Sequence, residues 1–380
     1  MQILSVDIGT GTQDLFLYDT RLDVENGFKL VLPSPTMIVH RRIKAATPHG
    51  TPILLTGVTM GGGPSHWAVE DHLHAGHAVY ATPDAARSFN DDLAEIRAMG
   101  IQVVSEDEAR RLPASVLRLE LKDFDFTAIQ GAFEHFGVSL QTLGLLTLAV
   151  FDHGAAPPQY SDRKFRFEYL AERLQTENRL SAFAYRAEHI PPSMTRLQAV
   201  AHSARGVDTS VMVMDTAPAA VLGATLDPRT RARPRTLLAN LGNFHTLAFR
   251  LGPGGIEGVF EHHTGLMTPA KLENLLRAFA DGSLTNEYVF EDKGHGALIS
   301  HPEPYTFPNN DFGLTVTGPR RSLLHASPLN PYFAVPFGDM MLAGCFGMLA
   351  AAGDVYPEWG EEIRAGLFHP GGVGRPPWEV

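Results

Sequence analysis

Residues 3–18 read ILSVDIGTGTQDLFLY, two apolar runs joined by a turn rich in glycine and threonine. Short apolar runs on either side of such a turn predict a β-hairpin. The two glycines allow a ligand to approach the backbone closely, and the N–H and hydroxyl groups of the turn can surround phosphate oxygens. Asp7 stands at the end of the first strand, where a carboxylate can hold Mg²⁺ through water. A plain tight hairpin with an exposed Asp7 is the alternative.

The same pattern returns in the second half of the chain. An apolar run at 235–241 ends in the turn NLGN at 240–243, and residues 246–251 and 255–261 supply two further strand patterns. An internal repeat of this kind indicates two copies of one supersecondary unit. It predicts two α/β lobes that face one another.

The repeat also predicts how the chain is divided. In the first half, residues 36–43 are the expected third strand, and the strand, helix, strand order over 116–150 is typical of a parallel α/β layer. We expect an N-terminal α/β lobe over 1–205, a C-terminal α/β lobe over 206–369, and a flexible tail, rich in proline and glycine, over 370–380.

Composition excludes several classes of protein. The 380 residues include 31 Lys and Arg against 42 Asp and Glu, so the formal charge is 31 − 42 = −11, which argues against binding to nucleic acid or to an anionic membrane. Cys345 is the single cysteine, which excludes a disulfide framework, a zinc ribbon and a cysteine-ligated iron–sulfur cluster. No apolar run reaches the roughly 18 residues of a membrane span, and no targeting signal is recognisable, so we expect a cytoplasmic protein.

Three motifs resemble those of the actin, Hsp70 and sugar-kinase ATPase superfamily, in the same order. DIGTGT at 7–12 is similar to its first phosphate motif, NLGNFHT at 240–246 to its second, and LTVTGPRR at 314–321 to its adenosine motif. Asn240 stands where the superfamily usually has Asp, and Pro319 replaces the second glycine of the adenosine motif. More narrowly, the chain resembles the DUF1786 family, whose members are sometimes labelled pyruvate formate-lyase activating enzymes. The resemblance implies a duplicated two-lobed actin-like ATPase fold of the ribonuclease H-like α/β class, with a cleft between the lobes.

The resemblance also implies a function, namely a phosphotransferase acting on a small-molecule substrate, or an ATPase, with ATP and Mg²⁺ as cofactors. Asp7 would hold the metal ion and take part in catalysis. Asp152, which ends the strand pattern at 145–151, would be the general base, with His153 as the second candidate. Capping of the turn before Gly154 is the alternative role for Asp152. Contacts to the nucleotide are expected from Gly9, Thr10, Gly11, Thr12, Asn240, Gly242, Asn243, Thr246, Gly318 and Arg320.

Histidines form a second set of candidates among the 17 in the chain. His153, His262, His263 and His295 follow strand ends or glycine turns, where ligands gather in α/β folds. They could bind substrate, or a metal ion, because neutral imidazole suits Zn²⁺, Fe²⁺ or Ni²⁺. The histidines within 66–77 do not follow the His-Glu-x-x-His spacing, and we interpret them as surface and capping residues.

Other functions stay open on the sequence. One is a slow nucleotide-dependent switch or scaffold of the actin or Hsp70 kind, and another is a metal-dependent hydrolase or binding protein that uses the histidines. A radical enzyme is excluded, because it needs three cysteines for its [4Fe–4S] cluster. The sequence does not identify the acceptor, although the loop TMGGGP at 59–64 could lie on the substrate side. A homodimer is compatible with these features.

Overall fold

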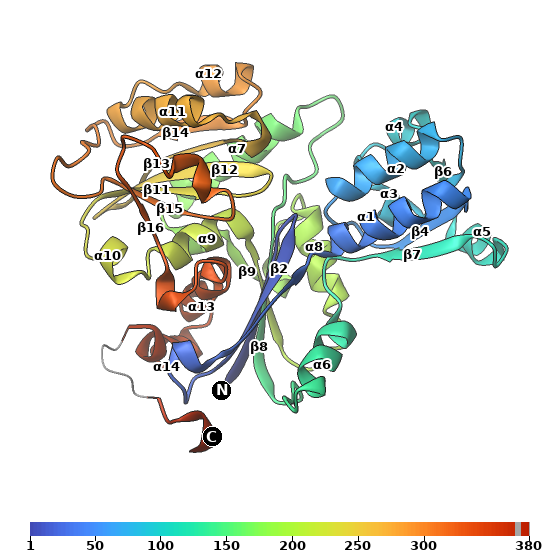
Figure 1. Ribbon diagram of the computed structural model, residues 1–380, viewed down its shortest axis with the longest axis horizontal. Helices are drawn as coiled ribbons and strands as arrows, with labels where there is room; N and C mark the ends of the chain where they lie inside the picture. The colour runs from blue at the N-terminus through green and yellow to red at the C-terminus, as the bar shows by residue number, and fades with distance from the viewer. Residues whose placement is uncertain (369–373, 380) are drawn as a thin grey trace.

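The computed structural model describes residues 1–368 and 374–379, which form two lobes and a smaller inserted domain (Figure 1). The sheet of the first lobe has the strand order β3-β2-β1-β8-β10-β9. These strands are β1 (Gln2–Ile8), β2 (Thr12–Asp19), β3 (Phe28–Pro33), β8 (Leu143–Val150), β9 (Ala184–Arg186) and β10 (Ser210–Asp215). The strands β1 to β3 are an antiparallel meander, whereas β1, β8 and β10 are mutually parallel.

Both faces of the first sheet are covered, which explains why its central strands are nearly continuous apolar runs. On one face, Leu4 and Val6 pack with helices α6 (Phe126–His135) and α8 (Thr195–Ser203). On the other face, Ile3 packs with helices from the far end of the chain, α13 (Ala343–Val355) and α14 (Pro357–Phe368).

A separate domain is inserted between β3 and α6, and it lies at the right of Figure 1. Its sheet is parallel, in the order β6-β5-β4-β7, and it has a core of its own. The strands are β4 (Ile53–Gly57), β5 (Val79–Ala81), β6 (Gln102–Val103) and β7 (Leu117–Leu121), and the helices are α1 (Pro35–Ala46), α2 (Pro64–His74), α3 (Pro83–Ala86), α4 (Leu93–Ala98) and α5 (Glu106–Arg111).

The second lobe repeats the plan of the first, with the strand order β14-β13-β12-β11-β15-β16. Its strands are β11 (Thr236–Leu241), β12 (His245–Gly252), β13 (Gly255–His263), β14 (Gly296–Ile299), β15 (Leu314–Thr317) and β16 (Pro331–Phe333). Again a three-stranded antiparallel meander is followed by two strands parallel to its first strand. The helices around this sheet are α7 (Asp162–Thr176), α9 (Thr216–Ala224), α10 (Pro228–Arg231), α11 (Pro269–Asp281) and α12 (Asn286–Glu291).

Hydrogen bonds at the two hairpin turns show that the halves are copies of one unit. Gly9 N donates to Thr12 O over 2.9 Å, and Gly242 N donates to His245 O over the same 2.9 Å. This match makes Asp7 the counterpart of Asn240. The strand order and this correspondence together establish the duplicated two-lobed actin-like ATPase fold that the sequence predicts.

Helices α9 and α13 join the lobes through a crossing that requires glycine. A Cβ on Gly223 would lie 1.7 Å from the carbonyl oxygen of Ala343, and a Cβ on Gly347 would lie 1.8 Å from that of Ala219. The contact is reciprocal, as expected when equivalent helices pack about a pseudo-twofold axis. Apolar as they are, neither these helices nor any other in the described residues is long and apolar enough to cross a membrane.

Two details differ from the sequence expectations, and a third concerns residues that are only partly described. Residues 36–43 are helical instead of forming a strand, because Ser34 caps the Met37 amide at 3.3 Å and Pro35 begins α1. The change of sheet falls between Asp215 and Thr236, later than the boundary expected at residue 205, since β10 pairs with β8. Of the tail expected over 370–380, residues 370–373 and 380 lie outside the described residues, while Arg375 N donates to Arg21 O at 2.8 Å.

Candidate functional site

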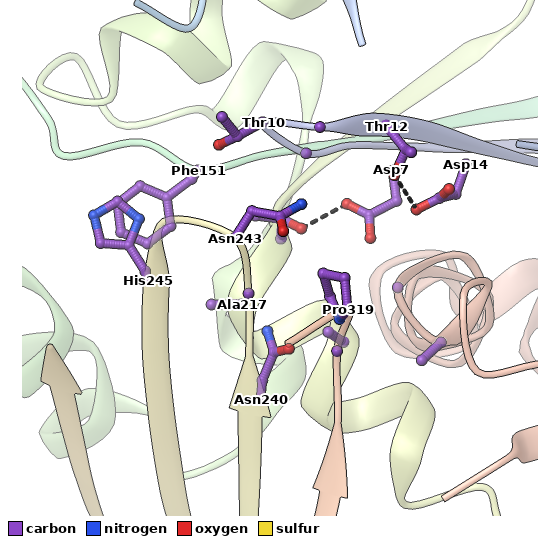
Figure 2. Close-up of a pocket in the computed structure, with 18 of the residues that line it drawn as sticks. Asp7, Thr10, Thr12, Asp14, Phe151, Ala217, Asn240, Asn243, His245 and Pro319 are labelled. Atoms are coloured by element: carbon purple, nitrogen blue, oxygen red, sulfur yellow. Dashed lines mark hydrogen bonds between the residues drawn. The ribbon is translucent and has the colours of Figure 1, made fainter. Parts of the chain in front are cut away.

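The two glycine turns meet between the lobes, where they line a cavity of about 120 Å³ (Figure 2). Their tips are in contact, since a Cβ on Gly11 would lie 2.8 Å from Asn243 Nδ2. The third glycine loop also reaches this point, because a Cβ on Gly63 would lie 3.5 Å from the ring of Phe244 and 3.6 Å from the methyl group of Thr10. The structure therefore brings the predicted phosphate turns to one place.

Most of the residues predicted to contact a nucleotide line this cavity. Thr246 does not, because its hydroxyl lies buried 2.9 Å from that of Thr264. Arg320 is exposed and does not line the cavity either. The predicted residues that line the cavity are Asp7, Gly9, Thr10, Gly11, Thr12, Asn240, Gly242, Asn243 and Gly318.

The turns present backbone donors to the cavity. Within the described part of the chain, the N–H groups of Thr10, Gly11, Asn243 and Phe244 donate no hydrogen bond, and all four residues line the cavity. Successive free amides in a turn make a concave site for an anion. Two such sites, one from each lobe, therefore flank the same space.

Asp7 and Asp14 place two carboxylates at the wall of this cavity (Figure 2). They lie opposite one another in the β1–β2 register, and Thr216 Oγ1 donates to Asp7 Oδ1 at 2.5 Å. Burial raises the pKa of Asp7 to about 6, an effect that the Thr216 hydrogen bond opposes. Burial raises the pKa of Asp14 to about 8, and the charge of Asp7 adds to the rise. A cation between the lobes would relieve this repulsion.

The two carboxylates differ in what surrounds them. Asp14 Oδ1 is buried and has no hydrogen-bond partner among the described residues. Gly344 lies in the first turn of α13, and a Cβ there would lie 1.9 Å from Asp7 Oδ2. Glycine at this position therefore lets the start of α13 pack directly against the carboxylate of Asp7.

A second cavity, of about 220 Å³, adjoins the first and is bordered by the glycine-rich loop at 59–63. Both cavities are lined by Thr10, Phe151, Arg196, Phe244 and His245. The two cavities are therefore separated by a wall of shared residues.

Asp152 and His153 lie at the second cavity, but the carboxylate of Asp152 is already engaged. Its Oδ1 accepts from Gly154 N and its Oδ2 accepts from Leu197 N, both at 2.8 Å. Burial raises the pKa of Asp152 above its usual range. These two bonds are those of a turn-capping carboxylate, the alternative role for Asp152, and they leave one lone pair on each oxygen.

Arg196 is a cation that sequence reasoning missed. Its guanidinium is held by Asp123, with Nε to Oδ2 at 2.7 Å and Nη2 to Oδ1 at 3.0 Å, and its Nη1 donates to Phe151 O at 2.7 Å. A Cβ on Gly61 would lie 2.6 Å from Nη2, so the glycine loop packs directly on this guanidinium. Arg196 thus places a fixed positive charge at the wall between the cavities.

The adenosine-like motif enters the cavity as a strand and a tight turn. Gly318 follows β15 with a φ of 96°, and a Cβ there would lie 2.5 Å from the carbonyl oxygen of Leu241. Glycine is therefore required at this position. Pro319 follows it at the cavity wall, and the chain continues into a short 3₁₀ turn, Arg321–Leu324, in place of a long helix.

Histidines from both lobes gather beside the shared wall. His153, His245 and His295 each offer a ring nitrogen, and these atoms all lie within 4.8 Å of one another. His263 lies next to them, with its ring centre 4.7 Å from that of His295. Burial lowers the pKa of His153 to about 3 and of His263 to about 4, and it lowers the pKa of His295 further still. These imidazoles are neutral at physiological pH.

His262, which the sequence grouped with this cluster, belongs to a different contact. Its Nε2 lies 3.1 Å from Asp292 Oδ2, and Lys271 Nζ lies 2.6 Å from the same oxygen. His245 takes part in the cluster instead. Sequence reasoning placed it in the phosphate motif alone, because its strand neighbours give no sign of the histidines that the fold brings beside it.

A buried ionic network lies beneath the histidines and connects the two lobes. Arg166 is fully buried. Its Nη1 donates a hydrogen bond to Asp215 Oδ2, and its Nε donates to Glu261 Oε2 at 3.3 Å. Burial raises the pKa of Glu261 to about 7, against the influence of Arg166. The Arg166 guanidinium also lies 4.5 Å from the ring centre of Phe151, the residue that follows β8.

Comparison with known proteins places the chain in a family. The family described as "Putative pyruvate format-lyase activating enzyme (DUF1786)" matches residues 60–323. The chain belongs to DUF1786. No curated protein matches it.

Several solved structures are weakly similar to this DUF1786 protein. The ethanolamine utilization protein EutJ of Carboxydothermus hydrogenoformans has 10% identity and a TM-score of 0.35, over 92% of this chain and 89% of that chain. The activator of 2-hydroxyisocaproyl-CoA dehydratase of Clostridium difficile, with bound ADPNP, has 10% identity and a TM-score of 0.34, over 95% and 98%. An exopolyphosphatase of Cytophaga hutchinsonii has 11% identity and a TM-score of 0.23, over 72% of this chain and 53% of that chain.

Proposed function

We propose that this chain binds ATP in the interlobe cavity and transfers its terminal phosphoryl group to a small molecule or to water. The observation that carries the proposal is the convergence of two equivalent turns, whose free amides at Thr10, Gly11, Asn243 and Phe244 line one cavity. Backbone amides bind phosphate oxygens without a lysine. Polyphosphate fits this arrangement, because two anion sites flank a single space.

The carboxylates fit Mg²⁺. Asp7 would hold the ion with Asp14 beside it, since Mg²⁺ takes oxygen ligands and keeps several waters. The buried Asp14 Oδ1, which has no hydrogen-bond partner among the described residues, supports this assignment. When bound, Mg²⁺ neutralises charge on the phosphates, as in other phosphoryl-transfer sites.

The second cavity is the proposed acceptor site. Arg196 lies between it and the nucleotide cavity, where a guanidinium would attract the terminal phosphate and orient it toward the acceptor. The hydrogen bonds of Asp152 would hold in place the loop that carries His153. His153 is the proposed proton acceptor. Catalysis would depend mainly on positioning and charge neutralisation.

The activity named in the family description does not fit the residues present. A radical-generating activase holds its iron–sulfur cluster with several cysteines. Cys345 is the single cysteine, and it is buried with its thiol 3.1 Å from Asp14 O. We therefore propose phosphoryl transfer without such a cluster.

Calorimetric titration with ATP and a non-hydrolysable analogue, with and without Mg²⁺, tests the proposal. We expect binding in both conditions, and we expect Asp7→Ala to weaken it about tenfold or more when Mg²⁺ is present and little when it is absent. Asp107→Asn, at an exposed carboxylate of α5, is the matched control. If the nucleotides bind neither with Mg²⁺ nor without it, the proposal is overturned.

Turnover separates an enzyme from a slow switch. Phosphate release or transfer that falls at least tenfold in Arg196→Gln, with nucleotide affinity retained, supports phosphoryl transfer at the wall between the cavities. Binding with negligible turnover, together with a change in shape or assembly, would favour the switch. The change in shape can be followed by small-angle scattering of the same samples.

A further inference from the structure

The histidine cluster brings together three segments of the chain that are distant in sequence. His153 follows β8 of the first lobe, His245 begins β12, and His295 precedes β14 of the second lobe. One ring nitrogen from each lies within 4.8 Å of the other two. The phosphoryl-transfer proposal uses His153 as a proton acceptor, but it gives no reason for three imidazoles to converge. A neutral imidazole has one acceptor nitrogen, so His153 bound to a metal ion would not accept that proton, and the two roles are alternatives for this side chain.

Several polar atoms of this cluster are buried without a partner. In the described part of the chain, His245 Nε2 and both ring nitrogens of His295 form no hydrogen bond. Buried polar atoms normally have partners, and each exception requires an explanation such as an ion. Glu261 Oε1 is also without a hydrogen bond, and it lies 3.5 Å from His295 Nδ1.

Packing fixes how the imidazoles are presented. The rings of Phe151 and His245 are stacked, with centres 3.9 Å apart and an angle of 3° between their planes. Glu261 faces Nδ1 of His295, which leaves Nε2 of that ring for the cluster. The positive charge of Arg166 beneath the cluster is paired with Asp215 and Glu261, so it is balanced within the core.

We propose that His153, His245 and His295 bind one divalent transition-metal ion, and that Glu261 orients His295 as a positioning residue. Imidazole suits Zn²⁺, Fe²⁺, Co²⁺ and Ni²⁺. A carboxylate on the far nitrogen of a ligating histidine is a common companion of such sites. With metal–nitrogen bonds of about 2.0–2.1 Å, the three nitrogens would lie closer together around the ion than the 4.8 Å that now bounds their separation.

Three protein ligands leave a coordination position free, as in sites where the metal binds a substrate or water. His153 and His245 both line the second cavity, and His245 lines the first as well. A molecule in the second cavity can therefore take the free position through a carboxylate, hydroxyl or water oxygen. This site is distinct from the carboxylates assigned to Mg²⁺, which are on β1 and β2.

Metal titration of the full chain tests the proposal. Protein freed of metal by a chelator is titrated with Co²⁺, whose visible spectrum reports coordination, and Zn²⁺ is then added to displace it. We expect one Co²⁺ per chain, nitrogen coordination, and displacement by one Zn²⁺. X-ray absorption of the zinc form should count about three imidazoles.

Variants locate the site within the chain. His245→Gln combined with His295→Gln should weaken the binding of Co²⁺ at least 100-fold, and Glu261→Gln should weaken it about 10- to 100-fold. His262→Gln, at the adjacent buried histidine bonded to Asp292, should retain the affinity. Circular dichroism confirms that each variant is folded.

The outcomes decide between a site and its absence. No stoichiometric binding of Co²⁺, Zn²⁺, Fe²⁺ or Ni²⁺ to the wild type overturns the proposal, as does unchanged affinity in the folded double variant. If the double variant fails to fold, the imidazole count on the wild type decides, and fewer than two imidazoles overturns the proposal. None of these readouts depends on nucleotide binding, so a failure of one proposal leaves the other standing.

Discussion

Replacement of Asp14 by Asn should change the pH dependence of stability in a direction that the buried carboxylates determine. Asp14 is buried opposite Asp7, and its pKa rises from 3.8 to about 8 in the folded chain. Between pH 5 and pH 7 the unfolded chain carries Asp14 ionised, whereas the folded chain carries it protonated. Stability therefore falls as pH rises, by about 1.36 kcal/mol per pH unit, or about 2.7 kcal/mol over this range.

Comparing Asp14→Asn with the wild type isolates the titration of the Asp14 carboxyl, because all other titrating groups are present in both proteins. We expect Asp14→Asn, relative to the wild type, to gain about 2.7 kcal/mol in the free energy of unfolding from pH 5 to pH 7. Urea unfolding followed by circular dichroism, in the presence of a chelator, measures it. Asp107→Asn, at an exposed aspartate of α5, is the control for the same substitution at the surface. A difference between Asp14→Asn and the wild type that stays constant from pH 5 to pH 7 would refute the reasoning.

Three further predictions concern the cavity and the helix crossing. Gly344→Ala should displace Asp7 and remove the Mg²⁺-dependent part of nucleotide affinity in calorimetry, because the added Cβ would lie 1.9 Å from Asp7 Oδ2. Gly347→Ala should lower the free energy of unfolding by at least about 1–3 kcal/mol in urea, since its Cβ would lie 1.8 Å from a carbonyl oxygen of the facing helix. The emission of Trp67, which stacks on Phe244 at 5.5 Å, should change when nucleotide moves the inserted domain against the second lobe.

Controls keep these results specific. Gly131 is a helical glycine whose added Cβ meets nothing within 4 Å, so Gly131→Ala should not destabilise the chain. For the fluorescence measurement, Trp359 and Trp378 are both replaced by Phe, so that all tryptophan emission comes from Trp67, the third tryptophan of the chain. Destabilisation by Gly131→Ala equal to that by Gly347→Ala would contradict the steric argument, and constant emission on binding would contradict movement of the inserted domain.

The fold could be predicted from the sequence because both hairpin turns carry a local signal. Apolar runs around Gly9 and Gly242 predict the strands, and the repeat predicts the second lobe. The error at 36–43 has a physical origin. The β-branched residues there favour a strand, but the local helix signals, a cap at Ser34 followed by Pro35, outweigh them. The sheet change after β10 could not be seen, because strand pairing across the chain leaves no local mark.

The site was less predictable, since its chemistry depends on contacts between distant segments. Asp14 could have been found, because a two-stranded register that places Asp7 at the cavity places its partner there as well. Arg196 and His245 could not, whereas His153 and His295 were among the sequence candidates for a metal site. His153, His245 and His295 converge through the packing of two lobes, and no spacing within the sequence encodes that convergence.

The duplication places different side chains at equivalent positions of the two lobes. The equivalence of the turns pairs Asp7 with Asn240 and Thr12 with His245, and the same register pairs Asp14 with Leu247. The first copy therefore has two carboxylates, which suit a hard cation beside phosphate. The second copy has an amide, an apolar side chain and an imidazole, so it adds no charge to the carboxylate pair. Burial, with the charge of Asp7 added to it, already raises the pKa of Asp14. Two further carboxylates in the same cavity would raise the pKa of both aspartates more, so the uncharged residues of the second copy favour an Asp7 that stays available for a cation.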